Sequence, residues 1–340
     1  MAAPSKTITY ETLQAFTKDV HDKKLVSDVQ IASPLVRLMN SKKMTEDMGE
    51  RININIDYRR SDGTGNKLFS LSDGLQDRDF FDDEMGTQAY VTPIWLERGI
   101  LITKQQQDVN KGQAQIVSLL DRKYKFLTEQ MQFGLKNATN GFWSDGTAAA
   151  GSWLGLPYYV RATGQGTNYS GAAVTGTVAN IDRTDSTYQY WTYNVVDDQT
   201  TLDTWNWKKM EEMENDCTED GSEERTPDVW ITTKAIFEHI WAQAHELQRN
   251  KIRTGLAAKL GLRVITFNGK EIIWDPFCPA SQMYALHTND WEWRVFPDSN
   301  MKVMEWEQSQ IKYAKQKSMI VGGQLVCTNP RRQGVFTALA

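Results

Sequence analysis

Two extended runs separated by a long polar segment constrain the fold of this chain most strongly. Isoleucines alternate with polar residues over 51–60 (RININIDYRR), which is the period-two pattern of a β-strand with one buried face. A second extended run covers 87–103, and residues 61–86 between them are rich in Gly, Ser and Asp. The pattern predicts a projecting β-hairpin. Such a long projecting segment is rare in a compact monomer, whereas a subunit can use it to contact neighbouring subunits.

A long amphipathic helix is predicted from about Asn110 to Ala138. Its stripe recurs at steps of three and four residues and consists of Ile116, Leu119, Leu120, Lys123, Tyr124, Leu127, Met131 and Leu135. Asn140-Gly141 supplies a stop signal. At 1.5 Å per residue such a helix would be roughly 42 Å long, which suits a spine that organises a flat subunit.

The remainder of the chain mixes the two types of element. Residues 1–50 have balanced charge and read as an extended arm with one short helix near residues 9–20. The later elements that the pattern predicts are helices at 201–215 and 234–248 and strands at 229–233, 262–275, 283–295, 301–306 and 318–328. An arm and a hairpin followed by a long helix and then mixed elements predict the α+β class.

Charge and hydropathy exclude several kinds of partner. The 340 residues carry a formal net charge of −5, so we do not expect the whole surface to bind nucleic acid electrostatically. Any contact with DNA should be local and weak. No stretch approaches eighteen consecutive apolar residues, which predicts no transmembrane helix. The N-terminus lacks the apolar run of a secretory signal, so we expect synthesis in the cytoplasm.

The metal-binding residue types do not form a recognisable site. Cys217, Cys278 and Cys327 are widely spaced without a CxxC pair, which favours incidental or buried reduced thiols. His239 and His245 stand six residues apart on a predicted helix, about 240° around its axis, and so cannot share a metal. They are interpreted as ordinary helix-surface histidines, and the isolated His21 and His287 are interpreted in the same way.

The acidic runs at 77–84 and 211–228 also favour a simple interpretation. Neither has EF-hand spacing, so both are most simply solvated surfaces. No phosphate-binding glycine loop, nucleophile elbow or Ser/Lys catalytic pattern is present. We therefore expect no catalytic residue, no cofactor and no metal, and predict that the chain is not an enzyme.

The second half of the chain resembles, segment by segment, the major capsid proteins of tailed double-stranded DNA bacteriophages, which have the HK97-type fold. The resemblance covers about residues 110–340. Its markers occur in the family's order and are the helix at 116–137, Asn140-Gly141, Gly155-Leu156, the block at 175–183, Tyr190-Trp191, Pro227–Thr233, the helix at 234–248, Ile272–Pro276, Cys278-Pro279, Met283–Leu286 and Gly323–Val335.

This resemblance implies a division of the chain. The implied parts are an N-terminal arm at 1–50, an extended E-loop hairpin at 51–103, a peripheral domain with the spine helix at 104–200, an axial domain at 201–290, and C-terminal strands at 291–340 that return to both domains. Arm and hairpin would reach over neighbouring subunits. The candidate inter-subunit contacts are Leu35, Val36, Leu38, Lys67, Phe69, Phe80 and Phe81.

The function that the resemblance implies is assembly. Hexamers and pentamers of the chain would form an icosahedral shell around the phage DNA, built in the host cytoplasm and found in the virion. A portal protein is an implied partner, a decoration protein an optional one, and scaffolding would come from a separate protein or none. Some relatives crosslink neighbours through Lys–Asn bonds, but no motif around Lys67 supports crosslinking here.

Three other functions are alternatives to that of a capsid subunit. An encapsulin-like nanocompartment has the same fold and is distinguished by enclosing protein cargo in place of DNA. An enzyme would need a coherent catalytic constellation and would tolerate a monomeric state. A tail or decoration component is disfavoured by the predicted spine helix and by the segment that ends the chain.

Overall fold

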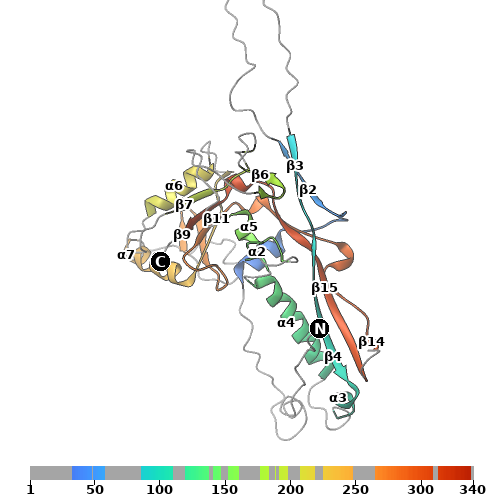
Figure 1. Ribbon diagram of the computed structural model, residues 1–340. Coiled ribbons are helices and arrows are strands. Elements are labelled where there is room, and N and C mark those ends of the chain that lie inside the picture. Colours follow the sequence, from blue (N-terminus) through green and yellow to red (C-terminus); the bar gives the residue numbers. More distant parts are fainter. Residues whose placement is uncertain are drawn as a thin grey trace, which may run out of the picture.

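The computed structural model contains two six-stranded sheets, flanking helices and a separate two-stranded hairpin, which confirms the predicted α+β class. Figure 1 shows the sheets side by side, with the hairpin leading away from them. The residues that the structure describes are 33–47, 49–57, 86–109, 119–137, 141–146, 152–160, 177–183, 188, 191–197, 207–218, 225–247, 265–308 and 313–337.

The first sheet is built around one long strand, β15 (Ala314–Cys327). Its last five residues, from Gly323 to Cys327, pair with β12 (Trp291–Val295), and its first ten form an antiparallel ladder with β4 (Ile94–Thr103). The short strands that complete the sheet are β1 (Lys43–Thr45), β13 (Lys302–Val303) and β14 (Glu307–Gln308). Helix α4 (Leu119–Lys136) packs along β4 and β15 and gives this lobe its elongated form (Figure 1).

The second sheet has the order β7-β16-β11-β8-β10-β9. Its strands are β7 (Asn194–Asp197), β8 (Val229–Thr232), β9 (Ile265–Phe267), β10 (Lys270–Trp274), β11 (Met283–Leu286) and β16 (Gly334–Thr337). The central strands β8 and β11 are buried at every position, as expected for strands covered on both faces. Helix α6 (Trp207–Thr218) packs against β7, and α7 (Lys234–Leu247) packs against β10.

The predicted hairpin pairing is confirmed. β2 (Ile52–Asp57) and β3 (Gly86–Val91) are antiparallel, with the register running from Ile52 opposite Val91 to Asp57 opposite Gly86. The extended run predicted at 87–103 is instead two strands in different sheets, β3 and β4, separated by Thr92-Pro93. Proline has no amide hydrogen to donate to a ladder, so the chain can change sheets there.

Two later runs are also divided. The run predicted at 262–275 is a hairpin, because Asn268 and Gly269 both adopt positive φ and reverse the chain between β9 and β10. The run predicted at 283–295 is broken by a 3-10 turn at Thr288–Asp290. β11 before this turn belongs to the second sheet and β12 after it to the first, so the turn carries the chain between the two lobes.

Helix α4 is described over its C-terminal part, and residues 110–118 of the predicted helix lie outside the described residues. Leu127, Met131 and Leu135 are buried, as the stripe predicts, whereas Tyr124 was assigned to the stripe wrongly and is exposed. The chain then turns tightly at Gly141, where a Cβ atom would lie only 2.4 Å from the Leu135 carbonyl oxygen. A glycine is required there by this close approach.

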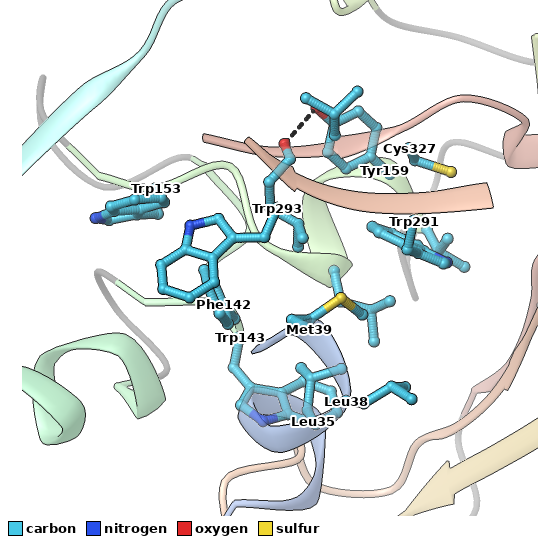
Figure 2. Close-up of a cluster of buried hydrophobic side chains, with 14 of the residues drawn as sticks. Leu35, Leu38, Met39, Phe142, Trp143, Trp153, Tyr159, Trp291, Trp293 and Cys327 are labelled. Carbon is cyan, nitrogen blue, oxygen red and sulfur yellow. Dashed lines mark hydrogen bonds between the residues drawn. The ribbon is translucent and has the colours of Figure 1, made fainter. Parts of the chain in front are cut away.

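One large core joins the two lobes. Figure 2 shows its aromatic centre, where Phe142 meets Trp153 and Trp293 edge to face, with ring centroids 5.8 and 5.2 Å apart. The Tyr159 hydroxyl donates to the Leu325 carbonyl at 3.0 Å and satisfies its polar end inside the core. Helix α2 (Pro34–Ser41) packs into the same cluster through three of its side chains, Leu35, Leu38 and Met39 (Figure 2).

A smaller apolar cluster lies between the second sheet and its helices. Its members are Met210, Met213, Cys217, Trp230, Ile236, Phe237, Ile240, Ile265, Ile272, Met283, Ala285 and Phe336. The remaining short elements are α3 (Lys104–Val109), α5 (Leu156–Tyr159), β5 (Thr177–Val178) and β6 (Ile181–Asp182), with 3-10 turns at Pro297–Ser299 and Pro330–Arg332.

Candidate assembly surfaces

The root of the hairpin is fixed to the body by a buried amide. Gln324 of β15 donates through Nε2 to the Thr92 carbonyl at 3.2 Å, and its Oε1 accepts from the Leu154 amide at 3.1 Å. The glutamine is fully buried, so these bonds are not exchanged with water. The hairpin therefore leaves the subunit from a rigid joint between β3, β15 and the loop before α5.

A tryptophan covers this joint from outside. The Trp95 ring stacks on Phe296, with centroids 5.3 Å apart and planes within 11°. It also lies against Gly322, where a Cβ would be 2.4 Å from the indole, so only glycine leaves room for the ring. Trp95 nevertheless remains more than half exposed. The joint thus presents a large apolar surface beside the projecting hairpin.

Of the candidate contacts named from the sequence, four are in the hairpin segment. Lys67, Phe69, Phe80 and Phe81 lie outside the described residues and stay predictions. The other three, Leu35, Val36 and Leu38, also stay predictions as contact residues. They are buried by their own chain in the first turns of α2. Sequence reasoning treated 1–50 as one extended arm, whereas residues from Ser33 onward form part of the subunit core.

Exposed aromatic residues on α4 form a surface that sequence reasoning missed. Phe126 and Phe133 stand seven residues apart on one face of the helix and are 46% and 47% exposed. Both phenylalanines lie outside the buried stripe of the helix, and this position in the sequence could have identified them as exposed. Large exposed side chains spaced along one helix face are a typical feature of protein contact surfaces.

The same lobe carries a second exposed cluster. The Lys317 ammonium of β15 lies 5.8 Å from the Tyr124 ring centroid and 5.5 Å from that of Trp306. Both rings are partly exposed, and Tyr313 nearby in sequence is 91% exposed. A cation between two aromatic faces is held in place before any neighbour arrives, which reduces the entropy lost on binding.

The second lobe also exposes an aromatic residue. Trp241 of α7 is 47% exposed and stacks on Phe237, with ring centroids 6.3 Å apart. Phe237 is buried against the second sheet, so it holds the tryptophan in a defined position. Both lobes therefore offer anchored aromatic side chains to a neighbouring molecule.

His239 and His287 are the histidines whose side chains the structure describes, and neither belongs to a metal-binding group. His239 lies on α7 with Nε2 at 2.9 Å from Gln243 Nε2. The surface interpretation of His287 is wrong, because this residue is buried and its Nδ1 lies 3.0 Å from Asp290 Oδ2. Among the described residues no group of three or more His, Cys, Asp or Glu is placed to hold a metal ion.

Cys217 and Cys327 are buried free thiols, and Cys278 is a partly buried one. Burial raises the pKa of Cys217 to about 12, and burial also raises the pKa of Cys278 and Cys327 well above the ordinary value. Thiols held protonated at neutral pH are poor nucleophiles and poor metal ligands. In the part of the chain that the structure describes, no helix is both long and apolar enough to span a bilayer.

Solved structures of shell-forming proteins share this fold. A chain of the cyanophage A-1(L) capsid is 14% identical, with a TM-score of 0.66 and 98% of each chain covered. A chain of the capsid of a native GTA particle is 9% identical, with a TM-score of 0.59 and coverage of 99% and 100%. The SrpI encapsulin of Synechococcus elongatus is 11% identical, with a TM-score of 0.56 and coverage of 94% and 92%.

No model of a protein family matches the chain, and no curated protein matches it by sequence. At these low identities the structural likenesses show the fold alone. The fold is the HK97-type capsid fold, shared over nearly the whole length of the chain, as the sequence resemblance predicted.

Proposed function

We propose that this chain is the major capsid protein of a tailed double-stranded DNA bacteriophage. Copies would assemble into hexamers and pentamers of an icosahedral shell that encloses the genome. The observation that carries this proposal is the fold shared with a cyanophage capsid chain over 98% of both chains. A likeness that extends from end to end supports the same role for the whole subunit, which is structural and not catalytic.

The exposed aromatic residues supply area for such an assembly. Phe126 and Phe133 on the first lobe and Trp241 on the second are all about half exposed in the isolated subunit. Burying apolar surface contributes about 25 cal/mol per Å², so each contact can be weak while the sum over a closed shell is large. Weak individual contacts also let wrongly placed subunits dissociate before the shell closes.

The hairpin would provide a second kind of contact. β2 and β3 pair with each other, and Ile52, Ile54, Ala89 and Val91 on one face pack into the subunit core. A neighbouring subunit could add a strand to an edge of this two-stranded sheet. In this proposal Lys67, Phe69, Phe80 and Phe81 lie in the segment that meets the neighbour.

The proposal includes the partners that the resemblance implies. A portal protein would occupy one vertex, a scaffolding protein would assist assembly, and a decoration protein is an optional addition. Assembly would take place in the host cytoplasm. The net charge of −5 supports a shell that contains DNA without adhering tightly to it.

A second candidate is an encapsulin-like compartment, which the likeness to the SrpI encapsulin favours. The two functions require the same subunit fold and the same kind of closed shell. They differ in what the shell contains. Genome-length DNA would identify a phage capsid, and a folded protein cargo would identify a compartment.

The experiment isolates particles from cells that produce this chain, by density-gradient sedimentation followed by cryo-electron microscopy. Mass spectrometry identifies the chain as the main shell component. Nuclease-protected DNA inside closed icosahedral particles supports the capsid function, whereas protein cargo supports the compartment. A chain that remains a 38.8 kDa monomer, with and without a co-produced scaffolding protein, contradicts both.

A further inference from the structure

A buried carboxylate from the second sheet holds the first turn of α2. Asp275 directly follows β10 and is only 1% exposed. Its Oδ2 accepts a hydrogen bond from the Ser33 hydroxyl at 2.6 Å and another from the Leu35 amide at 3.1 Å. Its Oδ1 accepts from the Phe277 amide at 2.8 Å. All three donors are therefore used to position one side chain.

Ser33 also caps the N-terminus of α2. As the N-cap residue of α2, its Oγ accepts from the Val36 amide at 3.4 Å while its hydroxyl hydrogen is donated to Asp275. The serine thus joins the start of the helix to a residue 242 positions later in the chain. A hydrogen bond to a buried carboxylate is stronger than one between neutral groups.

The other end of α2 is attached to the first sheet. The Trp293 amide of β12 donates to the Lys42 carbonyl at 3.1 Å, and β1 continues directly into a parallel pairing with β12. The helix therefore bridges the two lobes, with its start on the second sheet and its end on the first.

The C-terminal end of α4 lies close to Asp275 and Phe277. Phe133 contacts Phe277 edge to face at 6.1 Å between centroids. Burial lowers the pKa of Lys136, and Arg37 of α2 lowers it further while Asp275 raises it, so the three charges act on one another. Phe277 and Asp275 thus connect the exposed aromatic face of α4 with Ser33 at the start of α2.

We infer that the Ser33–Asp275 pair is an anchor that fixes the start of α2 against the second sheet, and that shell closure depends on this fixed position. This inference rests on the proposed assembly function. Ser33 and Asp275 are positioning residues, because they act on a neighbour only through the segment they hold. Burying an ionised carboxylate costs desolvation, and a buried polar contact of this kind is weak support for stability but can specify one arrangement.

The test compares Ser33→Ala with the matched control Thr288→Val in the full-length chain. Thr288 is also buried, and its hydroxyl also donates to an aspartate, Asp228, but that pair connects two segments of the body. Amide hydrogen exchange of α2 and the yield of closed particles are measured for both. Ser33→Ala should speed exchange at Leu35 and Val36 about tenfold and lower particle yield by a similar factor.

Thr288→Val should leave amide exchange of α2 and the particle yield near the wild-type values. This should hold even if its melting temperature falls as much as that of Ser33→Ala. Ser33→Thr, which keeps the hydroxyl, should restore both measurements. Unchanged α2 exchange in Ser33→Ala overturns the anchor, and so does an equal loss of particles in the two variants. If the wild type forms no particles under any condition, the assembly function fails, while α2 exchange still decides whether the pair holds the helix.

Discussion

At the scale of single residues, close approaches between backbones decide which side chains are tolerated. Gly323 lies where β15 is flanked on both sides, opposite Val295 of β12 and Ile94 of β4. A Cβ at this position would stand 2.1 Å from the Arg294 carbonyl oxygen. Backbone atoms of a paired strand cannot move aside as a flexible side chain can, so the position requires glycine.

Gly323→Ala should therefore destabilise the subunit, by about 1–3 kcal/mol or more in the free energy of unfolding. The matched control is Gly99→Ala on β4, where the nearest atom to a new Cβ is 3.9 Å away. Alanine there should be neutral within about 0.5 kcal/mol. Urea unfolding of the unassembled subunits measures both, and equal effects at the two positions would contradict this explanation.

Asp275 gives the stability of the subunit a pH dependence of defined sign. Burial raises the pKa of Asp275 above its ordinary value of 3.8, which outweighs the hydrogen bonds from Ser33, Phe277 and Leu35 that favour the ionised form. The folded state therefore holds this proton more tightly than the unfolded state. Its contribution to stability is complete below the unfolded pKa and is lost as pH rises through the folded pKa.

The free energy of unfolding of the wild type relative to Asp275→Asn should thus decrease as pH rises above about 4, and then become constant. Urea unfolding of both proteins across this pH range measures the difference. A difference that increases with pH would mean that the hydrogen bonds, and not burial, dominate at this carboxyl.

At the scale of elements, helix α4 has a buried face and an exposed aromatic face, to which the proposed function gives different roles. Leu127, Met131 and Leu135 pack against the first sheet, while Phe126 and Phe133 face outward. Adjacent residues on a helix point about 100° apart, so neighbouring positions in the sequence can serve folding and assembly separately. This allows the two roles to be tested with adjacent substitutions.

Phe126→Gln should reduce the yield of closed particles while changing the free energy of unfolding of the subunit by less than about 1 kcal/mol. Leu127→Ala should destabilise the subunit by about 2–5 kcal/mol, because it leaves a cavity in the core. Sedimentation measures the particles and urea unfolding the stability. If Phe126→Gln assembled like the wild type, this helix face would not be a contact surface.

The N-terminal segment is the second element that can be tested separately. Deleting residues 1–30 leaves Ser33 and the whole of α2 in place, so the subunit should remain folded and soluble. It should lose the ability to close shells, because a contact with neighbours is removed. Circular dichroism checks the fold and electron microscopy the particles. Normal shells from the truncated chain would exclude an assembly role for this segment.

At the scale of the whole molecule, the structure is one core with attached projections. The large apolar cluster contains residues of both sheets, such as Trp293 and Tyr284, so the lobes are tied together within one subunit. The hairpin of β2 and β3 leads away from this common body (Figure 1), and Phe126, Phe133 and Trp241 are exposed on its surface. Such an arrangement is suited to non-covalent contacts with several neighbours at once.

Mature particles should therefore dissociate into single chains under denaturing conditions. No motif around Lys67 supports a Lys–Asn crosslink, so denaturing electrophoresis of purified particles should give one band at 38.8 kDa. A ladder of covalent multimers would show instead that neighbouring subunits are crosslinked.

Local patterns in the sequence determined the elements with strong periodicity, including the buried strand β8, helix α7 and the buried stripe of α4. Periodicity is a property of neighbouring residues, so it can be seen without knowing the fold. The order of these elements predicted the α+β class, and the resemblance of residues 110–340 to tailed-phage major capsid proteins implied the HK97-type fold that the structural comparisons show.

Only the tertiary structure decided where the elements go. The uninterrupted runs at 87–103 and 283–295 each contribute to two sheets, and Leu35 is buried in the subunit core. The pairing of Ser33 with Asp275 had no sequence signal, because the residues are 242 positions apart. Contacts between distant segments depend on how the whole chain packs, which no local pattern encodes.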